Sequence, residues 1–432
     1  MNYQKFLQCF LTITILLCAL TILRAQNTDS SKADAPGEDV ILQWNRVLSQ
    51  TIATPGAHPA TIRTQRSYAM MHLAMFDAVN SIEGDYTPYL SDIPTAARAS
   101  VKAAAAQAAH DVLASLYPSR LGIFATELAD SLIGISPQQA FRGKAVGRAA
   151  AQRMLTHRAN DGWTVTPPAY VLPPTPGNWQ PTPPANAPAA FTHFPAVMPF
   201  ALAQSTQFLP PPPPALTSEQ YAAEFNEVKE LGAANSTTRT AEQTLTAQLW
   251  ATGATTEVYL NNLVRSLALS RNLTTAQNAR LFALFYVSTH DGLQTTFTSQ
   301  YTYGRWRPVT AIRRADEDDN PNTAADPNWT SLIAAPPYPS YASNASSLTS
   351  SAAKTLELFF GRDDIQFQIN FGGTPNVVRT YRSFSQMTDE AARSRVFGGI
   401  HFQSDTFYGQ IAGRNVATYV FLNLMRPRDC DF

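Results

Sequence analysis

The sequence lacks the features that direct a protein to nucleic acid or stabilise it with disulfides. Its formal net charge is zero over 432 residues and it has no long basic run, so neither nucleic acid nor an anionic membrane surface is an expected partner. It has only three cysteines: Cys9 and Cys18 in the N-terminal segment, and Cys430 near the chain end. We predict no internal disulfide in the mature chain, because Cys9 and Cys18 lie within the signal peptide predicted below. An anion would have to be bound in a focused pocket, because the whole protein offers no attracting field.

The apolar run at the N-terminus, FLTITILLCALTIL after Lys5, is too short for an ordinary membrane span. We predict a secretory signal peptide over residues 1–25; a lipoprotein signal at Cys18 and a retained signal anchor are the alternatives. Residues 26–37 are predicted to be a flexible leader. Residues 38–432 are predicted to form one exported domain, periplasmic or extracellular, with no stable membrane span in the mature chain.

Alternating strand patterns are nearly absent, whereas apolar residues recur every three or four positions from Val40 onward. SVKAAAAQAAHDVLASLY is alanine-rich and predicts a helix that packs closely against its neighbours. Near the C-terminus the same periodicity predicts helices over residues 347–360, 389–396 and 407–424. The predicted fold class is all-α, a bundle or a pair of bundles.

Residues 163–216 differ from the rest in their density of proline, as in LPPPPPAL. Proline excludes both helix interior and central strand, so this segment is predicted to be a loop. Its aromatic residues argue against full disorder. We expect an ordered, extended loop wrapped over the helices, at the mouth of a pocket or at a dimer contact.

The most informative stretch, SRVFGGIHFQSD, places Arg395, His401 and Asp405 around a Gly-Gly turn. The turn permits two helices to meet closely and aims the His401 imidazole into the space between them. Asp405, four residues on, is in range to orient the other ring nitrogen; it is also a candidate N-cap for the last helix. On its own, a single histidine is more often structural than functional.

Two other segments supply groups that bind anions. Arg307 precedes Pro308 at the end of a predicted helix, and Ser343 and Asn344 open another helix whose first N–H groups are unpaired. Arginine guanidinium groups are permanent, bidentate donors to oxyanions. Residues 300–405 therefore predict a pocket for a phosphate-like tetrahedron with the His401 nitrogen in line.

These segments resemble the three signatures of the vanadium-dependent haloperoxidases and the related type 2 phosphatidic-acid phosphatase superfamily. WRPVTAIR, EAARSR and GGIHF are similar to bacterial haloperoxidase-like members. The resemblance covers nearly the whole mature chain and implies two four-helix bundles, with a vanadate or phosphate pocket at the bundle core. It implies hydrogen peroxide, a halide and a small organic substrate as partners, or a phosphate ester; a homo-oligomer is compatible with it.

Carried over by position, His401 would be the residue bonded to vanadium, or the nucleophile of a phosphatase. Asp405 would support it. The oxyanion would be bound by Arg307, Arg395, Ser343 and the backbone N–H of Asn344.

The family pattern breaks at two positions. The signature lysine, seven residues before Arg307, is Gln300, and the histidine two residues after Ser343 is Ala345. A lost general acid–base reduces a rate by roughly 10²–10⁴-fold. A lost charge-stabilising donor costs roughly 10²–10³-fold. Arg305 is nearby but on a different helix face from Gln300, so it is not expected to replace the lysine.

Three hypotheses follow: a haloperoxidase with weak activity, a phosphatase that acts through His401, and a non-catalytic remnant that binds oxyanions. His193, in the proline-rich loop, is a candidate replacement for the lost acid, although no spacing supports it. His290 and Asp291 are predicted to be a buried structural pair.

Overall fold

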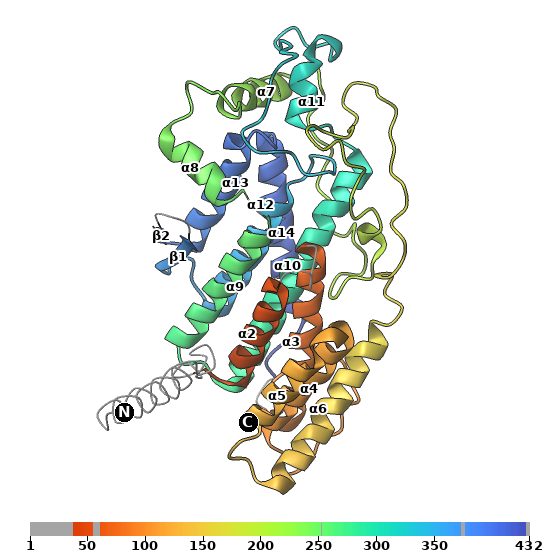
Figure 1. Cartoon of the computed structure of the whole chain (residues 1–432), viewed down its shortest axis with the longest axis vertical. Coiled ribbons are helices and arrows are strands. Elements are labelled where there is room, and N and C mark those ends of the chain that lie inside the picture. The colour runs from red at the N-terminus through yellow and green to blue at the C-terminus, as the bar shows by residue number, and fades with distance from the viewer. Residues whose placement is uncertain (1–37, 55–60, 252, 373–375, 429–432) are drawn as a thin grey trace, which may run out of the picture. The chain divides into compact units, whose positions relative to one another are not determined.

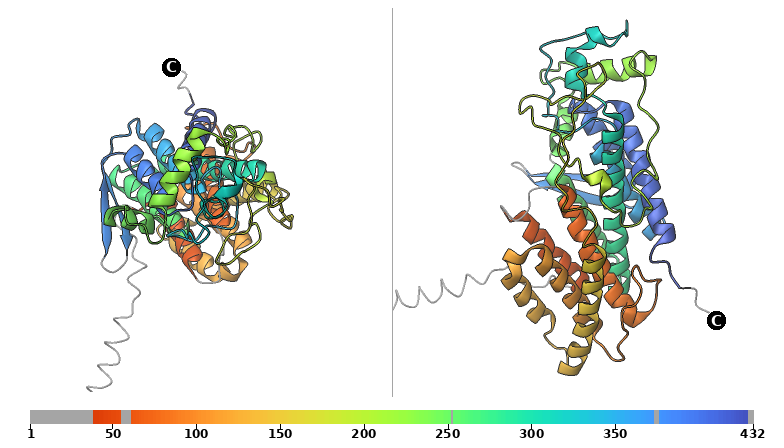
Figure 2. Two further views of the ribbon diagram at one scale, coloured as in Figure 1. Left: turned by 90° about the horizontal axis from the view of Figure 1, so that it is seen from above. Right: turned by 90° about the vertical axis from the view of Figure 1, so that its right-hand side faces the viewer.

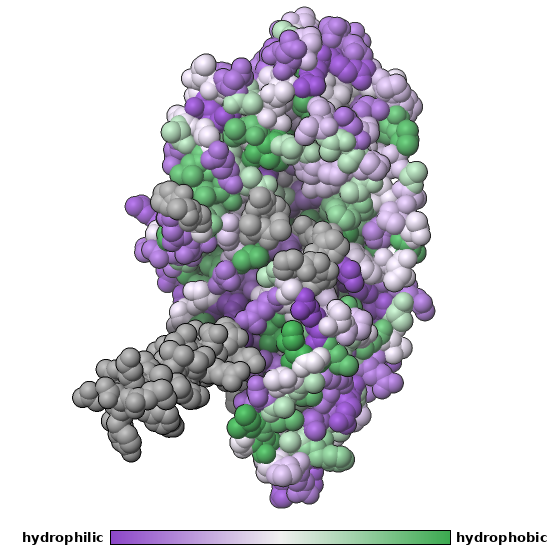
Figure 3. Space-filling model, viewed as in Figure 1, coloured by the Kyte–Doolittle hydropathy of each residue, from purple (hydrophilic) through white to green (hydrophobic). Residues whose placement is uncertain are grey.

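The computed structural model describes residues 38–54, 61–251, 253–372 and 376–428, and the structural statements below refer to these ranges. The predicted signal peptide and leader lie outside them. Within the described residues, helices of the length and apolar character needed to cross a membrane are absent. Hydrophilic and hydrophobic residues are interspersed on the face drawn in Figure 3.

The first group of helices is drawn in red to yellow in Figure 1. It consists of α2 (Val40–Ala53), α3 (Thr61–Glu83), α4 (Val101–Leu116), α5 (Leu121–Ser131) and α6 (Pro137–His157). The alanine-rich helix α4 packs tightly on α6, because α6 presents glycines to it. A Cβ at Gly147 would lie 2.3 Å from the Ala104 carbonyl oxygen. The predicted close packing of this helix is confirmed.

The second group of helices carries the three signature segments. It consists of α9 (Gly253–Ser270), α10 (Thr275–Tyr303), α12 (Asn344–Phe360), α13 (Phe384–Phe397) and α14 (Gln403–Asn423). Three shorter helices lie at one end of this group: α7 (Glu219–Leu231), α8 (Ala241–Leu249) and α11 (Pro308–Arg313). Within this group the long helix α10 is the one nearest the first group: it contacts α3 of the first group as well as α12 and α14 of its own (Figure 2).

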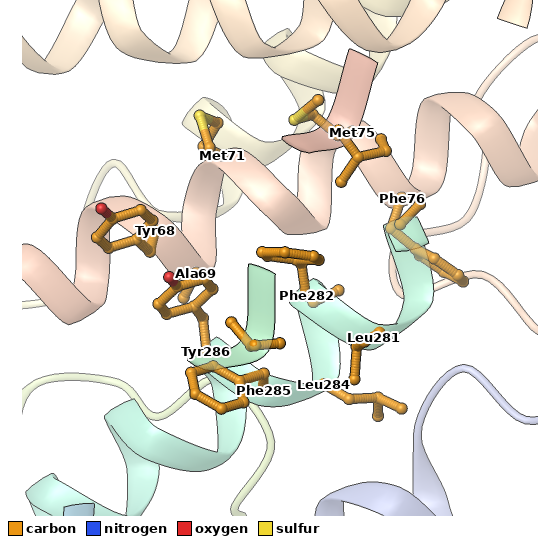
Figure 4. Close-up of a cluster of buried hydrophobic side chains, with 14 of the residues drawn as sticks. Tyr68, Ala69, Met71, Met75, Phe76, Leu281, Phe282, Leu284, Phe285 and Tyr286 are labelled. Carbon is orange, nitrogen blue, oxygen red and sulfur yellow. The ribbon is translucent and has the colours of Figure 1, made fainter. Parts of the chain in front are cut away.

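The hydrophobic core extends from one group of helices into the other. Figure 4 shows side chains of α3 packed against side chains of α10. These side chains include Met71 and Phe76 on α3 and Phe282 and Phe285 on α10, each at most 1% exposed. Burying one such side chain contributes roughly 1.5–3 kcal/mol. This packing fixes α10, and α10 in turn positions one wall of the site.

The only strands in the described residues are β1 (Phe367–Gly372) and β2 (Val377–Tyr381), which form an antiparallel hairpin with Phe367 opposite Tyr381. The sequence reading missed this hairpin, since its strands are too short for alternation to stand out. The all-helical class is otherwise confirmed.

The proline-rich segment, residues 163–216, forms an ordered loop whose only helical turn is the 3₁₀ turn Phe194–Ala196. It bonds to α10 and its C-cap. The backbone N–H of Trp179 donates to the carbonyl of the C-cap residue Gly304 at 2.7 Å, and the Asp291 carboxylate on α10 accepts the backbone N–H groups of Phe200 and Ala201. These bonds pair backbone N–H groups of the loop, which has no α-helix or sheet of its own to pair them.

Candidate functional site

His401 lies in the turn between α13 and α14. Gly399 adopts φ +74°, a left-handed conformation that glycine tolerates, and a Cβ there would lie 2.4 Å from the Gly232 carbonyl oxygen. The glycine therefore allows the turn to approach the end of α7. The imidazole that follows is buried, with 3% of the residue exposed.

Hydrogen bonds at both ring nitrogens fix the protonation of His401. Arg307 Nη1 lies 3.2 Å from Nε2, and because a guanidinium only donates, Nε2 is the acceptor. Nδ1 carries the proton and donates to Asp405 Oδ2 at 3.1 Å. Burial, and then the charge of Arg307, lower the pKa of His401 to about 4 in spite of Asp405. The imidazole is neutral at neutral pH.

Asp405 is the hub of this network. Burial alone would raise its pKa, but Arg305, with Nη1 2.8 Å from Oδ1, and the hydrogen bonds from His401 and Ser340 lower the pKa to about 2. Its Oδ2 also accepts the Phe402 N–H at 3.0 Å. The N-cap of α14 is Phe402, not Asp405, but Asp405 caps the helix from inside its first turn.

Two buried arginines flank the imidazole. Arg307 Nε donates to the Tyr338 carbonyl at 2.8 Å and Nη1 donates to the Ile400 carbonyl at 2.9 Å, while its Nη2 is buried with no partner among the described residues. Arg395 Nε donates to Ser394 at 3.0 Å. Burial lowers the pKa of Arg395 to about 10, so the group remains cationic at neutral pH.

The N-terminus of α12 forms the opposite side of the site. Ser343 is its N-cap and accepts the Ser346 N–H at 3.5 Å. The Ser343 N–H itself donates to the Asp405 carbonyl at 2.9 Å, which joins α12 to α14. Gln300 Nε2 donates to the Ala342 carbonyl at 2.8 Å and to Asn344 Oδ1 at 3.1 Å, so this amide is fully engaged within the protein.

A cavity of about 400 Å³ opens between these two sides. Of the residues predicted from the sequence, His401, Arg395 and Asn344 line it, as does Ala345 at the substituted position. The others are not among the lining residues: Arg307 and Asp405 bond to His401, and Gln300 bonds to Asn344. Ser343 bonds to Asp405. Ala190 and Phe191 of the proline-rich loop also line the cavity.

Sequence reasoning missed Ser340 and discounted Arg305. Both contact Asp405 from segments 65 and 100 residues away in the chain, and spacing within a segment gives no signal for such contacts. His193 is buried but is not among the residues that line the cavity. His290 and Asp291 are buried and bonded to each other at 2.9 Å, as predicted.

The fold and the second helical bundle are both similar to those of known proteins. Residues 280–429 match the sequence family described as the VCPO second helical-bundle domain. A crystal structure of the first bacterial vanadium-dependent iodoperoxidase superposes with a TM-score of 0.76 at 24% identity, covering 90% of this chain and 96% of that one. A holo-type bacterial vanadium-dependent chloroperoxidase superposes with a TM-score of 0.71 at 16% identity, covering 89% and 96%.

A vanadium chloroperoxidase from Curvularia inaequalis is 24% identical over 269 residues, which span 47% of this chain and 44% of that protein. The chain thus spans less than half the length of this curated relative. These matches agree with the resemblance found in the sequence: the chain has the fold of the vanadium-dependent haloperoxidases, and part of it matches the second helical-bundle domain.

Proposed function

We propose that this chain is a vanadium-dependent haloperoxidase that uses hydrogen peroxide to oxidise a halide, at a vanadate bound by His401. The observation that carries the proposal is the state of the imidazole: it is neutral, its Nδ1–H is held by Asp405, and its Nε2 lone pair lies beside a cationic guanidinium. This lone pair would bond to a metal centre in place of its hydrogen bond from Arg307, whose N–H would then donate to the negatively charged oxygens.

The residues present fit such an oxyanion. Arg307 has a buried Nη2 without a partner, and burying a donor unsatisfied costs about 1–3 kcal/mol. Arg395 supplies a second buried cation at the cavity wall, and the N-terminus of α12 lies opposite. When bound, vanadate would supply the Lewis-acid centre that activates peroxide towards the halide. The chain's own residues bind and orient it and exclude water.

Proton transfer is the weak part of this site. Ala345 lines the cavity at the position of the family's acid–base histidine, and Gln300 carries no charge at the position of its lysine. The described residues that line the cavity include no carboxylate and no second imidazole. We therefore expect slow turnover with retained oxyanion binding.

Halide oxidation by the vanadate-loaded protein tests the proposal. Wild type and His401→Ala would be assayed with peroxide and iodide, bromide or chloride over a broad pH range. Activity above the variant's background supports the proposal, whereas equal rates at every pH and halide would end it.

A second candidate, an oxyanion-binding protein without catalysis, is favoured by the engagement of the Gln300 amide with Ala342 and Asn344, which leaves it no donor for a ligand. Its distinguishing result is vanadate or phosphate binding without halide oxidation and without hydrolysis of aryl phosphates. Release of alcohol from aryl phosphates above the His401→Ala background would instead favour the phosphatase hypothesis.

A further inference from the structure

Arg395 is held at the cavity wall by neutral oxygens instead of a carboxylate. Among the described residues, its Nε donates to the Ser394 hydroxyl at 3.0 Å and its Nη2 donates to the backbone carbonyl of Trp250. Its Nη1 has no hydrogen-bond partner in the same part of the chain, so this nitrogen remains available to a ligand in the cavity. The direction of Nη1 therefore depends on where the two acceptor oxygens lie.

Trp250 provides the second of these oxygens and is itself anchored to α13. It is the C-cap of α8, where a helix leaves carbonyls without intrahelical partners and where its dipole favours a cation. The residue is 2% exposed, and its indole Nε1–H donates to Glu390 Oε1 at 3.0 Å. Trp250 thus contacts α13 at two points, because its indole bonds to Glu390 and its carbonyl bonds to Arg395.

The β-hairpin fixes the Glu390 carboxylate. Its Oε1 also accepts the Tyr381 hydroxyl at 2.6 Å, and its Oε2 lies 2.8 Å from Arg379 Nη1. Both partners belong to β2, and Arg379 also donates to the Thr246 hydroxyl of α8 at 3.0 Å. One carboxylate therefore joins the hairpin, α8 and α13, although Glu390, Tyr381 and Arg379 are not among the residues that line the cavity.

We propose that Glu390 is a positioning residue for Arg395: by holding the Trp250 indole, it holds the carbonyl that directs the guanidinium towards an oxyanion in the cavity. The inference rests on the proposed function, because the oxyanion bound there is the ligand of Arg395. It gives the hairpin and α8 a role in the site, although none of their residues is among those that line the cavity.

Calorimetric titration of the whole protein with orthovanadate tests the inference. Glu390→Ala removes the acceptor of the indole N–H and should weaken binding roughly 10–100-fold, the usual effect of losing a group that orients a ligand-binding side chain. Trp250→Phe tests the same bond from its other end and should weaken binding in the same range. Glu390→Gln keeps an oxygen that accepts the indole N–H, so its affinity should return close to that of wild type.

Two further variants separate positioning from a general loss of structure. Glu242→Ala removes the other carboxylate paired with Arg379 and is the matched control, with an affinity that should equal that of wild type. Arg395→Lys keeps a cation, and hence measurable binding, but an ammonium lacks the fixed fork that the Trp250 carbonyl orients. Adding Glu390→Ala to Arg395→Lys should therefore weaken binding much less than Glu390→Ala does alone.

Wild-type affinity in Glu390→Ala or Trp250→Phe would overturn the inference, as would an equal loss in Glu242→Ala, no recovery in Glu390→Gln, or an undiminished loss in the Arg395→Lys background. Halide oxidation by wild type keeps the two claims apart. Affinities in the expected order without halide oxidation support the inference and reject the proposed function. Halide oxidation with unchanged affinity in Glu390→Ala rejects the inference alone, and no orthovanadate binding by wild type rejects both.

Discussion

The two sides of the cavity are built by opposite means. On the histidine side, His401 is held by Asp405, which is held by Arg305, and the adjacent Arg307 and Arg395 are permanent charges. On the amide side, Gln300 and Asn344 bond to each other and Ala345 contributes only a methyl group.

The difference separates two tasks that one pocket can combine. Binding an oxyanion needs fixed positive charge and a neutral imidazole, and the histidine side retains both. Moving protons during turnover needs a second titratable group, and the amide side has none. Under the proposed function, the chain thus keeps the groups that would bind an oxyanion, while the described residues of the cavity lack those that would turn it over quickly.

The largest expected effect comes from converting the amide side to the family pattern. Ala345→His should raise halide oxidation by roughly 10²–10⁴-fold, because it restores a general acid–base. Adding Gln300→Lys should contribute roughly 10²–10³-fold more through charge stabilisation. Steady-state rates of the single and double variants measure both effects. A folded double variant that binds vanadate but gains no rate would show that these losses are not decisive.

The next effect tests the histidine side as a structural unit. Arg305→Ala removes the buried cation paired with Asp405 and should lower the free energy of unfolding by about 3–5 kcal/mol. Denaturant unfolding measures the loss. Arg314→Ala, which breaks a more exposed pair with Glu317, is the control and should cost much less. Equal losses of unfolding free energy in the two variants would show that the buried pair of Arg305 and Asp405 contributes no more to stability than an exposed pair.

A smaller effect is expected where α14 meets the start of α12. A Cβ at Gly409 would lie 2.6 Å from the Ser343 carbonyl oxygen, so Gly409→Ala should destabilise by about 1–3 kcal/mol. Gly122, on α5, has nothing within 4 Å of the same added atom, and Gly122→Ala should leave stability unchanged or slightly higher. Thermal unfolding compares the pair, and similar melting temperatures would argue against this close approach.

The smallest effect concerns pH. The pKa of His401 is lowered from 6.5 to about 4 on folding, so between these values the unfolded chain binds the extra proton. Wild type should therefore lose stability on going from pH 7 to pH 5, relative to a His401→Asn variant in which the other titrating groups are the same. Unfolding free energies of both proteins at both pH values give the comparison. Parallel behaviour would mean that His401 titrates normally.

The periodicity of apolar residues predicted which segments are helical, but it did not predict the residue at which each helix begins. The predicted helices began at Ser347, Asp389 and Phe407, whereas α12, α13 and α14 begin at Asn344, Phe384 and Gln403. Each first turn is polar or mixed, and its residues are placed by contacts from elsewhere in the fold. Asp405 shows this, since it lies inside the first turn of α14 because its carboxylate caps the Phe402 N–H.

The candidate site likewise contains some contacts that the sequence predicts and others that it does not. Local spacing predicted that Asp405 lies near His401, because the two residues are only four positions apart in the chain. It could not predict that Arg305 pairs with Asp405, since that contact depends on how α11 and its preceding loop pack on α14. Phe191, Phe297 and Tyr338, which line the cavity, likewise come from three distant segments and follow no local pattern.

The most direct test of the whole account is a calorimetric titration with orthovanadate of wild type, His401→Ala, Arg395→Ala and His193→Ala. His193 is a buried histidine that does not line the cavity and serves as the control. The account predicts that wild type and His193→Ala bind alike, and that His401→Ala and Arg395→Ala bind much more weakly. No binding by wild type, or binding that survives His401→Ala, would contradict it.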